Sequence, residues 1–274
     1  MKLLQTYQGS WAEHGIHPIF DSRGPLNWVR FSLVTLHQNH APIMISSGGD
    51  ELAVVILSGI LTAEVANHRW AHLGGRLTVF EEPATTVYVP RDSNIQLESE
   101  TERAEMAVCR TQVEQIFQPF VIGPQDVAVQ QRGREQWHRE VRNILGAGAA
   151  GSVARLVLGE TIQNAGQWSG YPPHKHDTEH GEQENIFEEV YHYRLDPPNG
   201  FAVQVHYGAT GFDDRAYLVH NGDSFAIPGG YHPAVVQGGY RLYYLWVMAG
   251  PSGRDPHPFE DPQYRWVEER KVSV

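Results

Sequence analysis

The sequence predicts an all-β protein built from two similar β-barrels in tandem, and three observations support this. Short runs of β-forming residues recur along the 274-residue chain and are separated by glycine and proline. Helical periodicity is confined to two weak candidates, residues 111–117 and 124–129. The two halves also align at an offset of roughly half the chain. Short strands with such punctuation are typical of a sandwich or barrel, not of alternating strands and helices.

The first half consists of short strands joined by tight turns. Asn27–Leu36 alternates and is rich in β-formers, and the mostly apolar run after it ends in a Ser58-Gly59 turn. Cys109 lies in the last strand of this half, where a buried, inert thiol is expected rather than a nucleophile. The predicted strands are 27–36, 52–60, 61–65, 76–80, 85–89, 94–98 and 104–110.

The amino-acid composition of the chain changes between residues 135 and 151. The small, flexible run Gly146–Gly151 is typical of a linker, so we divide the chain into an N-terminal barrel, 1–145, and a C-terminal barrel, 146–274. The dense polar cluster Arg132–Arg139 just before it has two interpretations. A solvated connection is slightly favoured over a lid or subunit contact.

The second half repeats the pattern of the first. Asp196–Gly200 forms a turn between two strands, Asn221–Asp223 forms a tight turn, and a long apolar strand closes the half. The predicted strands are 154–161, 166–170, 189–194, 201–207, 216–219, 224–227 and 241–248.

The stretch from Tyr171 to His232 carries the chemistry. His174 and His176 are two apart, and residues i and i+2 of a strand project from the same face, so both can bind one ion. The pair Glu188-Glu189 adds a carboxylate on a predicted strand, and His232 follows a Pro-Gly-Gly turn. Imidazoles with a carboxylate suit zinc, manganese, iron, cobalt or nickel better than calcium.

The aligned first half keeps the strands but lacks this ligand pattern. Its Val87–Arg91 segment matches Phe225–Gly229, and His37 falls opposite His174. Asn39 and Ile95, however, fall opposite His176 and His232. We therefore expect one working barrel and one structural partner.

Composition excludes several classes of function. The formal net charge is −11 without a basic run, which argues against nucleic acid and anionic membranes as partners. Cys109 is the only cysteine, so neither a disulfide framework nor a thiolate metal site is expected. Because no apolar run reaches membrane-spanning or signal-peptide length, a soluble cytoplasmic protein is expected.

A double barrel with a His-x-His pair, a glutamate and a later histidine resembles a bicupin, two tandem cupin barrels of the double-stranded β-helix or jelly-roll type. Longer strings resemble one family, the 5-deoxy-glucuronate isomerases of myo-inositol catabolism. The strings that carry the resemblance are 168–177, 188–194, 230–233 and 243–251. The related 4-deoxy-5-threo-hexosulose-uronate ketol-isomerases share the metal pattern. His192 and Trp246 depart from the family, which has Tyr and Asn at these positions.

The resemblance implies a metal site and a reaction. His174, His176, His232 and Glu189, preferred over Glu188, would hold a divalent metal, zinc before manganese, iron, cobalt or nickel. The activity implied is aldose–ketose isomerisation of 5-deoxy-D-glucuronate to 5-dehydro-2-deoxy-D-gluconate. This reaction needs a polarised carbonyl and, in its proton-transfer form, a general base. The candidates for that catalytic role are Glu188, Tyr191, Tyr231 and His206.

The substrate's carboxylate requires a cationic partner in this acidic protein. Strand parity argues against Lys175 and Arg194, and Arg241 stays open. Two other functions compete with the isomerase: another metal cupin enzyme such as an Fe(II) dioxygenase, and a non-catalytic sugar-binding bicupin. The exposed strand edges of such barrels also suggest a homo-oligomer.

Overall fold

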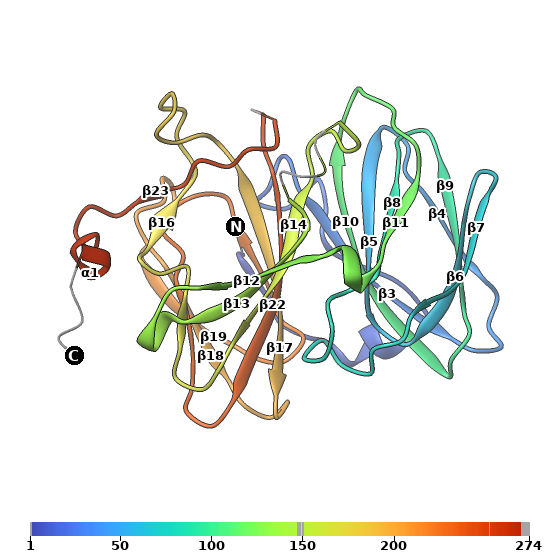
Figure 1. Ribbon diagram of the computed structural model, residues 1–274, viewed down its shortest axis with the longest axis horizontal. Helices are drawn as coiled ribbons and strands as arrows, with labels where there is room; N and C mark the ends of the chain where they lie inside the picture. Colours follow the sequence, from blue (N-terminus) through green and yellow to red (C-terminus); the bar gives the residue numbers. More distant parts are fainter. Residues whose placement is uncertain (1, 147–148, 150, 252, 270–274) are drawn as a thin grey trace.

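A computed structural model describes residues 2–146, 149, 151–251 and 253–269 of the chain. It confirms the all-β prediction. Figure 1 shows two β-barrels side by side, one built from the N-terminal half and one from the C-terminal half. Helical structure in the described ranges is limited to short 3-10 turns and to α1 (Trp266–Glu269). No described helix has the length and apolar character needed to cross a membrane.

The first barrel consists of a six-stranded sheet in the order β11-β8-β5-β10-β3-β2 and a four-stranded sheet in the order β4-β9-β6-β7. The strands are β2 (Gly15–Phe20), β3 (Arg30–His37), β4 (Ile43–Ser46), β5 (Asp50–Ser58), β6 (Ile60–Val65), β7 (His68–Gly74), β8 (Thr86–Val89), β9 (Asn94–Ser99), β10 (Arg103–Gln112) and β11 (Phe120–Ile122).

The second barrel has a seven-stranded sheet in the order β1-β20-β17-β22-β14-β13-β12, a four-stranded sheet in the order β15-β21-β18-β19, and the small pair β16-β23. The strands are β1 (Leu4–Gln5), β12 (Ala128–Arg132), β13 (Arg139–Leu145), β14 (Val157–Gln163), β15 (Trp168–Ser169), β16 (His174–Lys175), β17 (Glu188–Asp196), β18 (Ala202–His206), β19 (Arg215–Val219), β20 (Ser224–Ile227), β21 (Ala234–Val236), β22 (Arg241–Ala249) and β23 (Phe259–Glu260).

The strand order confirms the internal repeat. The series β8-β5-β10-β3-β2 of the first barrel has the same arrangement as β20-β17-β22-β14-β13 of the second. Antiparallel pairing runs through both series, and the central strands β5 and β17 each pair with a long strand near the end of their own half. The two halves therefore share one topology.

The chain changes from one barrel to the other between β11 and β12. β12 pairs with β13 and β13 with β14, so strand pairing joins the two sides of the predicted division at residues 145/146. The N-terminal strand β1 pairs with β20 of the second barrel. Residues 147, 148 and 150 of the predicted linker lie outside the described residues. The division into separate domains at that point stays a prediction.

The two large sheets pack against each other through a shared core. Alternate side chains of β5 and β10, among them Val55 and Cys109, meet Val190 of β17 and Val247 of β22 in one buried cluster. Cys109 is buried there, as predicted, and burial raises the pKa of its thiol.

Two glutamates connect the barrels in a reciprocal way. Glu51 of β5 accepts hydrogen bonds from the backbone N–H groups of Ala154, Arg155 and Leu156, at 2.7 to 2.8 Å. Glu188 of β17 accepts hydrogen bonds from residues 27 and 28 of the first half. Each carboxylate thus satisfies backbone donors of a segment that leads into a strand of the opposite barrel.

The interior of the first barrel is apolar. Leu52 and Ile95, which align with Glu189 and His232 of the second half, belong to a fully apolar cluster with residues such as Val34, Leu61 and Met106. These hydrophobic side chains fill the interior positions that Glu189 and His232 occupy in the second barrel. This arrangement agrees with the expected structural role of the first half.

Some predicted elements were wrong. Residues 76–80 form turns rather than a strand, because the Arg76 side chain is buried in an ion pair with Glu160 at 2.7 Å and donates to the carbonyl of Leu57. Residues 111–117 continue β10 and then form a loop, and 124–126 form only a 3-10 turn, so neither weak helix exists. The strands that were not predicted from the sequence are β1, β2, β4, β7, β11, β12, β13, β21 and β23.

The Glu51 contacts predict a large stability effect. Glu51→Gln removes the charge of a buried carboxylate that three backbone donors share, so we expect the free energy of unfolding to fall by about 1–3 kcal/mol. Urea unfolding followed by circular dichroism measures the change. Glu64→Gln is the matched control, because Glu64 forms an exposed ion pair with Arg69 and should change stability by less than about 0.5 kcal/mol. Equal effects would contradict the anchoring role of Glu51.

Candidate metal centre

Three histidines meet inside the second barrel. One nitrogen from each of His174, His176 and His232 lies within 4.8 Å of the other two. Oε2 of Glu189 lies 3.3 Å from Nε2 of His176 and 3.3 Å from Nε2 of His232. The structure thus brings together all four side chains that the sequence predicts as metal ligands.

The surrounding strands explain this convergence. His174 lies on the short strand β16, and Glu189 faces the barrel interior from β17, where Tyr191 and Tyr193 follow it on the same face. His232 follows β20 through the Pro228-Gly229-Gly230 turn, which brings the chain back across the barrel.

Glycines make this turn fit its neighbours. A Cβ atom on Gly229 would lie 2.7 Å from Cβ of Asp177, and one on Gly230 would lie 2.8 Å from the carbonyl oxygen of Tyr207. Gly230 also has φ +79°, and its N–H donates to Oδ2 of Asp177 at 2.7 Å. This bond connects the loop after His176 to the turn before His232.

Backbone carbonyls orient two of the imidazoles. Nδ1 of His176 lies 2.7 Å from the carbonyl oxygen of Phe187, and Nδ1 of His232 lies 2.8 Å from that of Gly230. With the proton on Nδ1, each ring donates to its carbonyl and turns the lone pair of Nε2 towards Glu189. Such hydrogen bonds are the usual support of metal-binding histidines. Nε2 of His232 is buried without a hydrogen-bond partner.

The electrostatics keep the carboxylate charged. Burial alone would raise the pKa of Glu189, but the hydrogen bond with His176 and the nearby His232 outweigh burial and hold the pKa at about 2. Burial and the two neighbouring histidines lower the pKa of His174 to about 3, so this ring is neutral. Burial opposes protonation of His176 too, but Glu189 raises its pKa. A bound cation would replace that proton.

These residues fit a divalent metal. Three imidazole nitrogens and one carboxylate oxygen, two of the rings held by backbone carbonyls, form a donor set typical of transition-metal sites in proteins. The orphaned Nε2 of His232 has no other use among its described neighbours. The cluster can therefore hold a metal ion.

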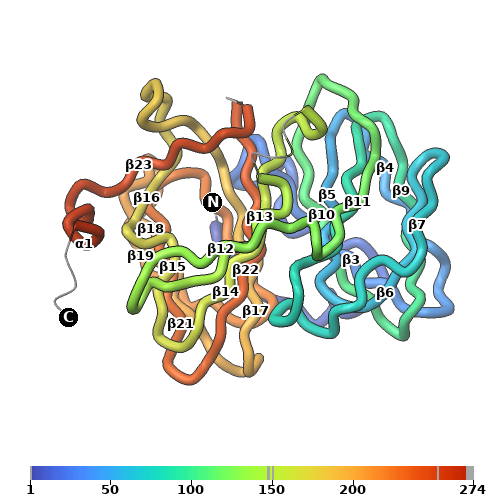
Figure 2. The backbone as a smooth tube through the Cα atoms, in the orientation of Figure 1, coloured from blue at the N-terminus to red at the C-terminus, as the bar shows by residue number. Residues whose placement is uncertain are grey.

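A cavity of about 440 Å³ opens over the cluster. Its walls include His174, His176 and Glu189, aromatic side chains of the barrel, and residues of the β12–β13 hairpin and the C-terminal segment. In Figures 1 and 2 this hairpin runs across the front of the second barrel. The residues other than the cluster that bear on the chemistry are Arg132, Arg139, Tyr191, Tyr244, Trp246, Arg254, Glu260 and Glu268.

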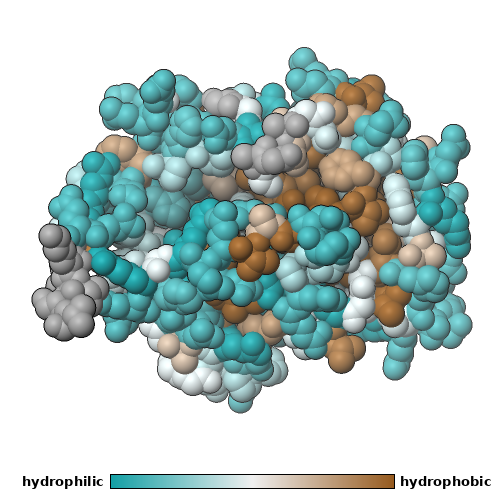
Figure 3. All heavy atoms as spheres, viewed as in Figure 1, coloured by the Kyte–Doolittle hydropathy of each residue, from teal (hydrophilic) through white to brown (hydrophobic). Residues whose placement is uncertain are grey.

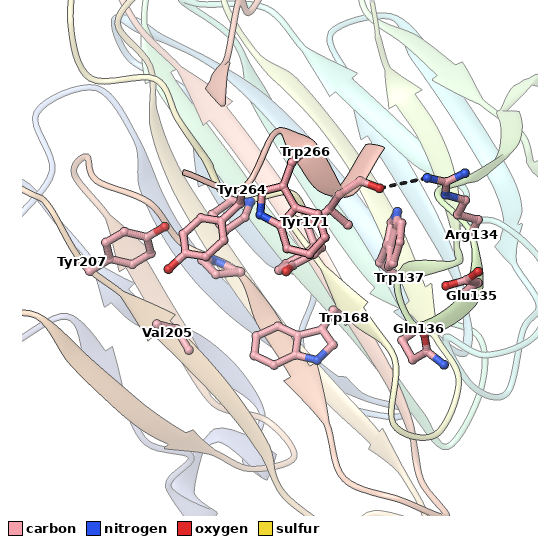
Figure 4. Close-up of a pocket in the computed structure, with 13 residues that line it drawn as sticks. Arg134, Glu135, Gln136, Trp137, Trp168, Tyr171, Val205, Tyr207, Tyr264 and Trp266 are labelled. Atoms are coloured by element: carbon pink, nitrogen blue, oxygen red, sulfur yellow. Dashed lines mark hydrogen bonds between the residues drawn. The ribbon is translucent and has the colours of Figure 1, made fainter. Parts of the chain in front are cut away.

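A larger cavity of about 740 Å³ lies beside the first and shares Tyr171 with it. Figure 4 shows Trp168, Tyr171, Tyr264 and Trp266 grouped around this space, with Arg134 at its edge donating to the carbonyl of Val267 at 2.9 Å. None of the four clustered ligands lines it. Six of its thirteen lining residues are aromatic, and the four clustered side chains lie away from it.

The structure places the Glu188 carboxylate away from the cluster, so the geometry does not support its predicted catalytic role. Alternation along β17 turns its side chain away from Glu189, and its carboxylate accepts hydrogen bonds from Asn27 N, Asn27 Nδ2 and Trp28 N at 2.7 to 2.8 Å. Glu188 is therefore neither next to the cluster nor free to move a proton there. Of the two adjacent glutamates, Glu189 is the one at the cluster.

The other three candidate bases occupy different places. Tyr191 lines the cavity, and its ring centroid lies 6.0 Å from that of His232. Tyr231 stacks on Tyr207 at 4.9 Å and does not line the cavity, so the geometry does not support its predicted catalytic role. His206 is buried behind the site, with Nε2 2.7 Å from the carbonyl oxygen of Gly229. Tyr191 alone faces the cluster.

The predicted cations are engaged elsewhere. Lys175 pairs with Asp177 and Glu184, Arg194 with Glu105, and Arg241 with Asp196. Two cationic residues of the cavity, Arg132 and Arg139, were not predicted from the sequence. Their segment is exposed or half-buried, as a solvated connection would be, but these two residues line the cavity as well. The alternation of Arg139, Val141 and Asn143, which all line the cavity, was the signal available.

The two departures from the family pattern differ in position. Trp246 lines the cavity, and Gly159 lets it approach, because a Cβ there would lie 2.5 Å from the indole. His192 is buried on the opposite face of β17, where its Nδ1 lies 2.9 Å from Oγ of Ser224. Only Trp246 can alter the shape of the site.

Sequence comparisons with known proteins all indicate the same family. A sequence model of the KduI/IolB family matches residues 5–267. The 5-deoxy-glucuronate isomerase of Bacillus licheniformis is 34% identical over 272 residues, covering 98% of this chain and 99% of that protein. The enzyme of the same name from Geobacillus kaustophilus is 37% identical over 225 residues, covering 82% of this chain and 80% of its own.

Comparison with solved structures indicates the same family and the same fold. An IolB-like protein from Salmonella typhimurium matches with a TM-score of 0.90 and 32% identity, over 98% of this chain and 100% of that one. Oxalate decarboxylase from Lactobacillus farciminis matches with a TM-score of 0.69 over 99% of this chain and 91% of its own, but at 10% identity, so it shows the fold alone. The bicupin fold expected from the sequence is confirmed.

Substitution of the adjacent glutamates separates their roles. Glu189→Gln removes the charged donor from the cluster, so we expect metal affinity to fall by about 100-fold or more. Glu188→Gln should leave metal affinity unchanged and lower the free energy of unfolding by about 1–3 kcal/mol, because its partners are backbone donors. Titration with Zn²⁺ and thermal unfolding measure both quantities. Loss of metal affinity in Glu188→Gln would contradict the assignment.

Proposed function

The chain belongs to the KduI/IolB family and is an isomerase, and we propose that it converts 5-deoxy-D-glucuronate to 5-dehydro-2-deoxy-D-gluconate in the breakdown of myo-inositol. The proposal includes dependence on a divalent metal, with zinc as the first choice. One observation carries it: His174, His176, His232 and Glu189 form one donor set, and three of the four, all but His232, line a cavity of about 440 Å³, large enough for a small sugar acid. Similarity to enzymes named for this reaction supports it.

The reaction moves hydrogen between C2 and C1 of the sugar. A metal ion held by the cluster would supply a Lewis acid that polarises the carbonyl. The chain's own residues then have three tasks: to hold the donor set, to exclude bulk water, and to donate hydrogen bonds to the sugar oxygens. Glu189 is buried and charged, which suits it to bind a cation rather than to move a proton.

Tyr191 is the residue we assign to hydrogen bonding with the substrate. Burial and the nearby Glu189 raise the pKa of Tyr191 well above its ordinary value, so its hydroxyl keeps its proton and acts as a donor. Its ring packs on Tyr244 at 4.4 Å, and the hydroxyl of Tyr244 in turn bonds that of Ser169. This packing restricts the ring and positions the hydroxyl in the cavity.

The proposal extends to the cellular setting. A role in inositol breakdown implies a cytoplasmic enzyme, and the single buried cysteine is compatible with a reducing compartment. We also propose a homo-oligomer, because both barrels end in open sheets whose edge strands, such as β7 of the first barrel and β19 of the second, can pair or be covered. Sedimentation velocity measures the oligomeric state directly.

Turnover followed by NMR tests the reaction. Purified protein should convert 5-deoxy-D-glucuronate to the ketose, and a chelator should abolish the conversion until Zn²⁺ or Mn²⁺ is restored. An absence of turnover in metal-loaded protein would contradict the proposed reaction. Oxygen uptake by iron-loaded protein, without isomerisation, would instead favour a dioxygenase.

The ligand assignment predicts a specific loss. His176→Ala should lower metal content and turnover by at least about 100-fold while the barrel stays folded, because it removes one of four donors. Metal analysis, NMR turnover and circular dichroism measure the three quantities. His180→Ala is the matched control, since His180 is exposed in the loop after β16 and should keep metal and activity. An active, metal-free His176→Ala protein would overturn the proposal.

The role of Tyr191 predicts a change in kcat. Tyr191→Phe keeps the ring packing and removes one hydroxyl donor, so kcat should fall by about 100-fold with metal content unchanged. Tyr231→Phe is the matched control, because that ring stacks on Tyr207 outside the cavity. Similar losses in both variants would contradict a direct role for Tyr191.

A further inference from the structure

Two arginines lie opposite each other on the hairpin that crosses the cavity. Arg132 ends β12, Arg139 begins β13, and the two are register partners in the antiparallel pair. Both line the same cavity as His174 and Glu189. Because directly opposite residues of an antiparallel pair project from the same face, the two guanidinium groups approach the cavity together.

The charge of this pair is not neutralised within the described part of the chain. Arg132 donates to Oε1 of Gln130, and Arg139 donates to the carbonyl of Trp137, but neither has a carboxylate within 4.0 Å in that part. Glu260 and Glu268 line the cavity without forming an ion pair with either one. This is unusual for a protein with a net charge of −11.

The contrast with other arginines is informative. Most arginines of the described ranges have an acidic partner, even exposed ones such as Arg215 with Asp213. The third arginine of the cavity, Arg254, donates hydrogen bonds to the carbonyls of Leu145, Gly146 and Leu156. These bonds hold its side chain in the cavity wall. Arg132 and Arg139 are therefore the cations best placed to receive an anion from the cavity.

The positive charges of Arg132 and Arg139 repel each other. Burial and the positive charge of Arg139 both lower the pKa of Arg132. Two like charges at neighbouring positions of a hairpin destabilise each other unless an anion lies between them. Figure 3 shows a mostly hydrophilic surface on the side of the second barrel, and β12 with Arg132 is exposed to solvent.

We propose that Arg139, together with Arg132, binds the carboxylate of the substrate and gives the site its preference for uronates over neutral sugars. The inference rests on the proposed function, since it assigns the acid group of that same substrate. Guanidinium forks bind carboxylates with paired, charge-assisted hydrogen bonds, and the clustered ligands lie in the same cavity to receive the carbonyl end. Arg139 and Arg132 thus orient the sugar relative to the cluster.

Binding of a stable uronate tests the pair without turnover. Protein kept in chelator is titrated with D-glucuronate and with neutral D-glucose, and binding is measured by calorimetry or ligand-observed NMR. We expect wild type to bind D-glucuronate more tightly than D-glucose. Arg139→Gln should weaken D-glucuronate binding by about 10- to 100-fold, and D-glucose binding should not change. Arg139→Lys should restore part of the affinity, because it keeps the charge but not the fork.

Kinetics of the metal-loaded protein provide the second readout. Arg139→Gln and Arg132→Gln should raise KM for 5-deoxy-D-glucuronate more than they lower kcat, and both should reduce the dependence of KM on salt. Arg215→Gln is the matched control, since this arginine is exposed on β19 outside the cavity. Arg132→Gln also serves if Arg139→Gln fails to fold.

The outcomes separate the two proposals. Wild type that binds D-glucuronate through the arginines without isomerising 5-deoxy-D-glucuronate would overturn the proposed reaction and support the carboxylate site. The opposite result is also possible. If wild type isomerises the substrate and the folded arginine variants keep the wild-type preference for D-glucuronate over D-glucose, the carboxylate site is overturned and the proposed reaction stands.

Discussion

The alternation of side chains along β17 is the constraint on which the rest of the structure depends. Glu188 and Glu189 are adjacent, so the pleat sends one carboxylate to the first barrel and the other into the second. Glu188 satisfies backbone donors of the opposite half, which fixes β17 against it. Glu189, on the other face of the strand, points into the second barrel, where two histidines lie 3.3 Å from its carboxylate. A slip of one residue would exchange the two tasks and destroy both.

The two barrels share a topology and divide the work. In the first, Leu52 and Ile95 belong to a dry apolar core, and this barrel supports β17 and β22 of the second through the shared hydrophobic cluster. In the second, polar ligands replace that core and leave a cavity of about 440 Å³. A hollow barrel with buried polar groups has less apolar packing of its own, so the packed barrel beside it compensates for the loss.

Sequence reasoning reached the fold and the four clustered side chains because both depend on local signals. The His-x-His spacing, the alternation around Glu189 and the glycine turn before His232 all specify direction over a few residues. The features that were not predicted depend on strand pairing and ion pairs between residues far apart in the sequence. The alternation of Arg139, Val141 and Asn143 indicates a strand, but it does not show that this strand pairs with β14 and crosses the cavity. Likewise, nothing near Arg76 in the sequence shows that its side chain forms a buried ion pair with the distant Glu160.

Metal-dependent chemistry inside the second barrel is the central claim, and anomalous X-ray scattering from crystals soaked in Mn²⁺ or Zn²⁺ tests it most directly. We predict an anomalous peak enclosed by His174, His176, Glu189 and His232, with none inside the first barrel, whose core is apolar. In crystals that also contain a uronate, its carboxylate should lie against Arg139. A metal peak away from these four side chains, or none at saturating metal, would contradict the account.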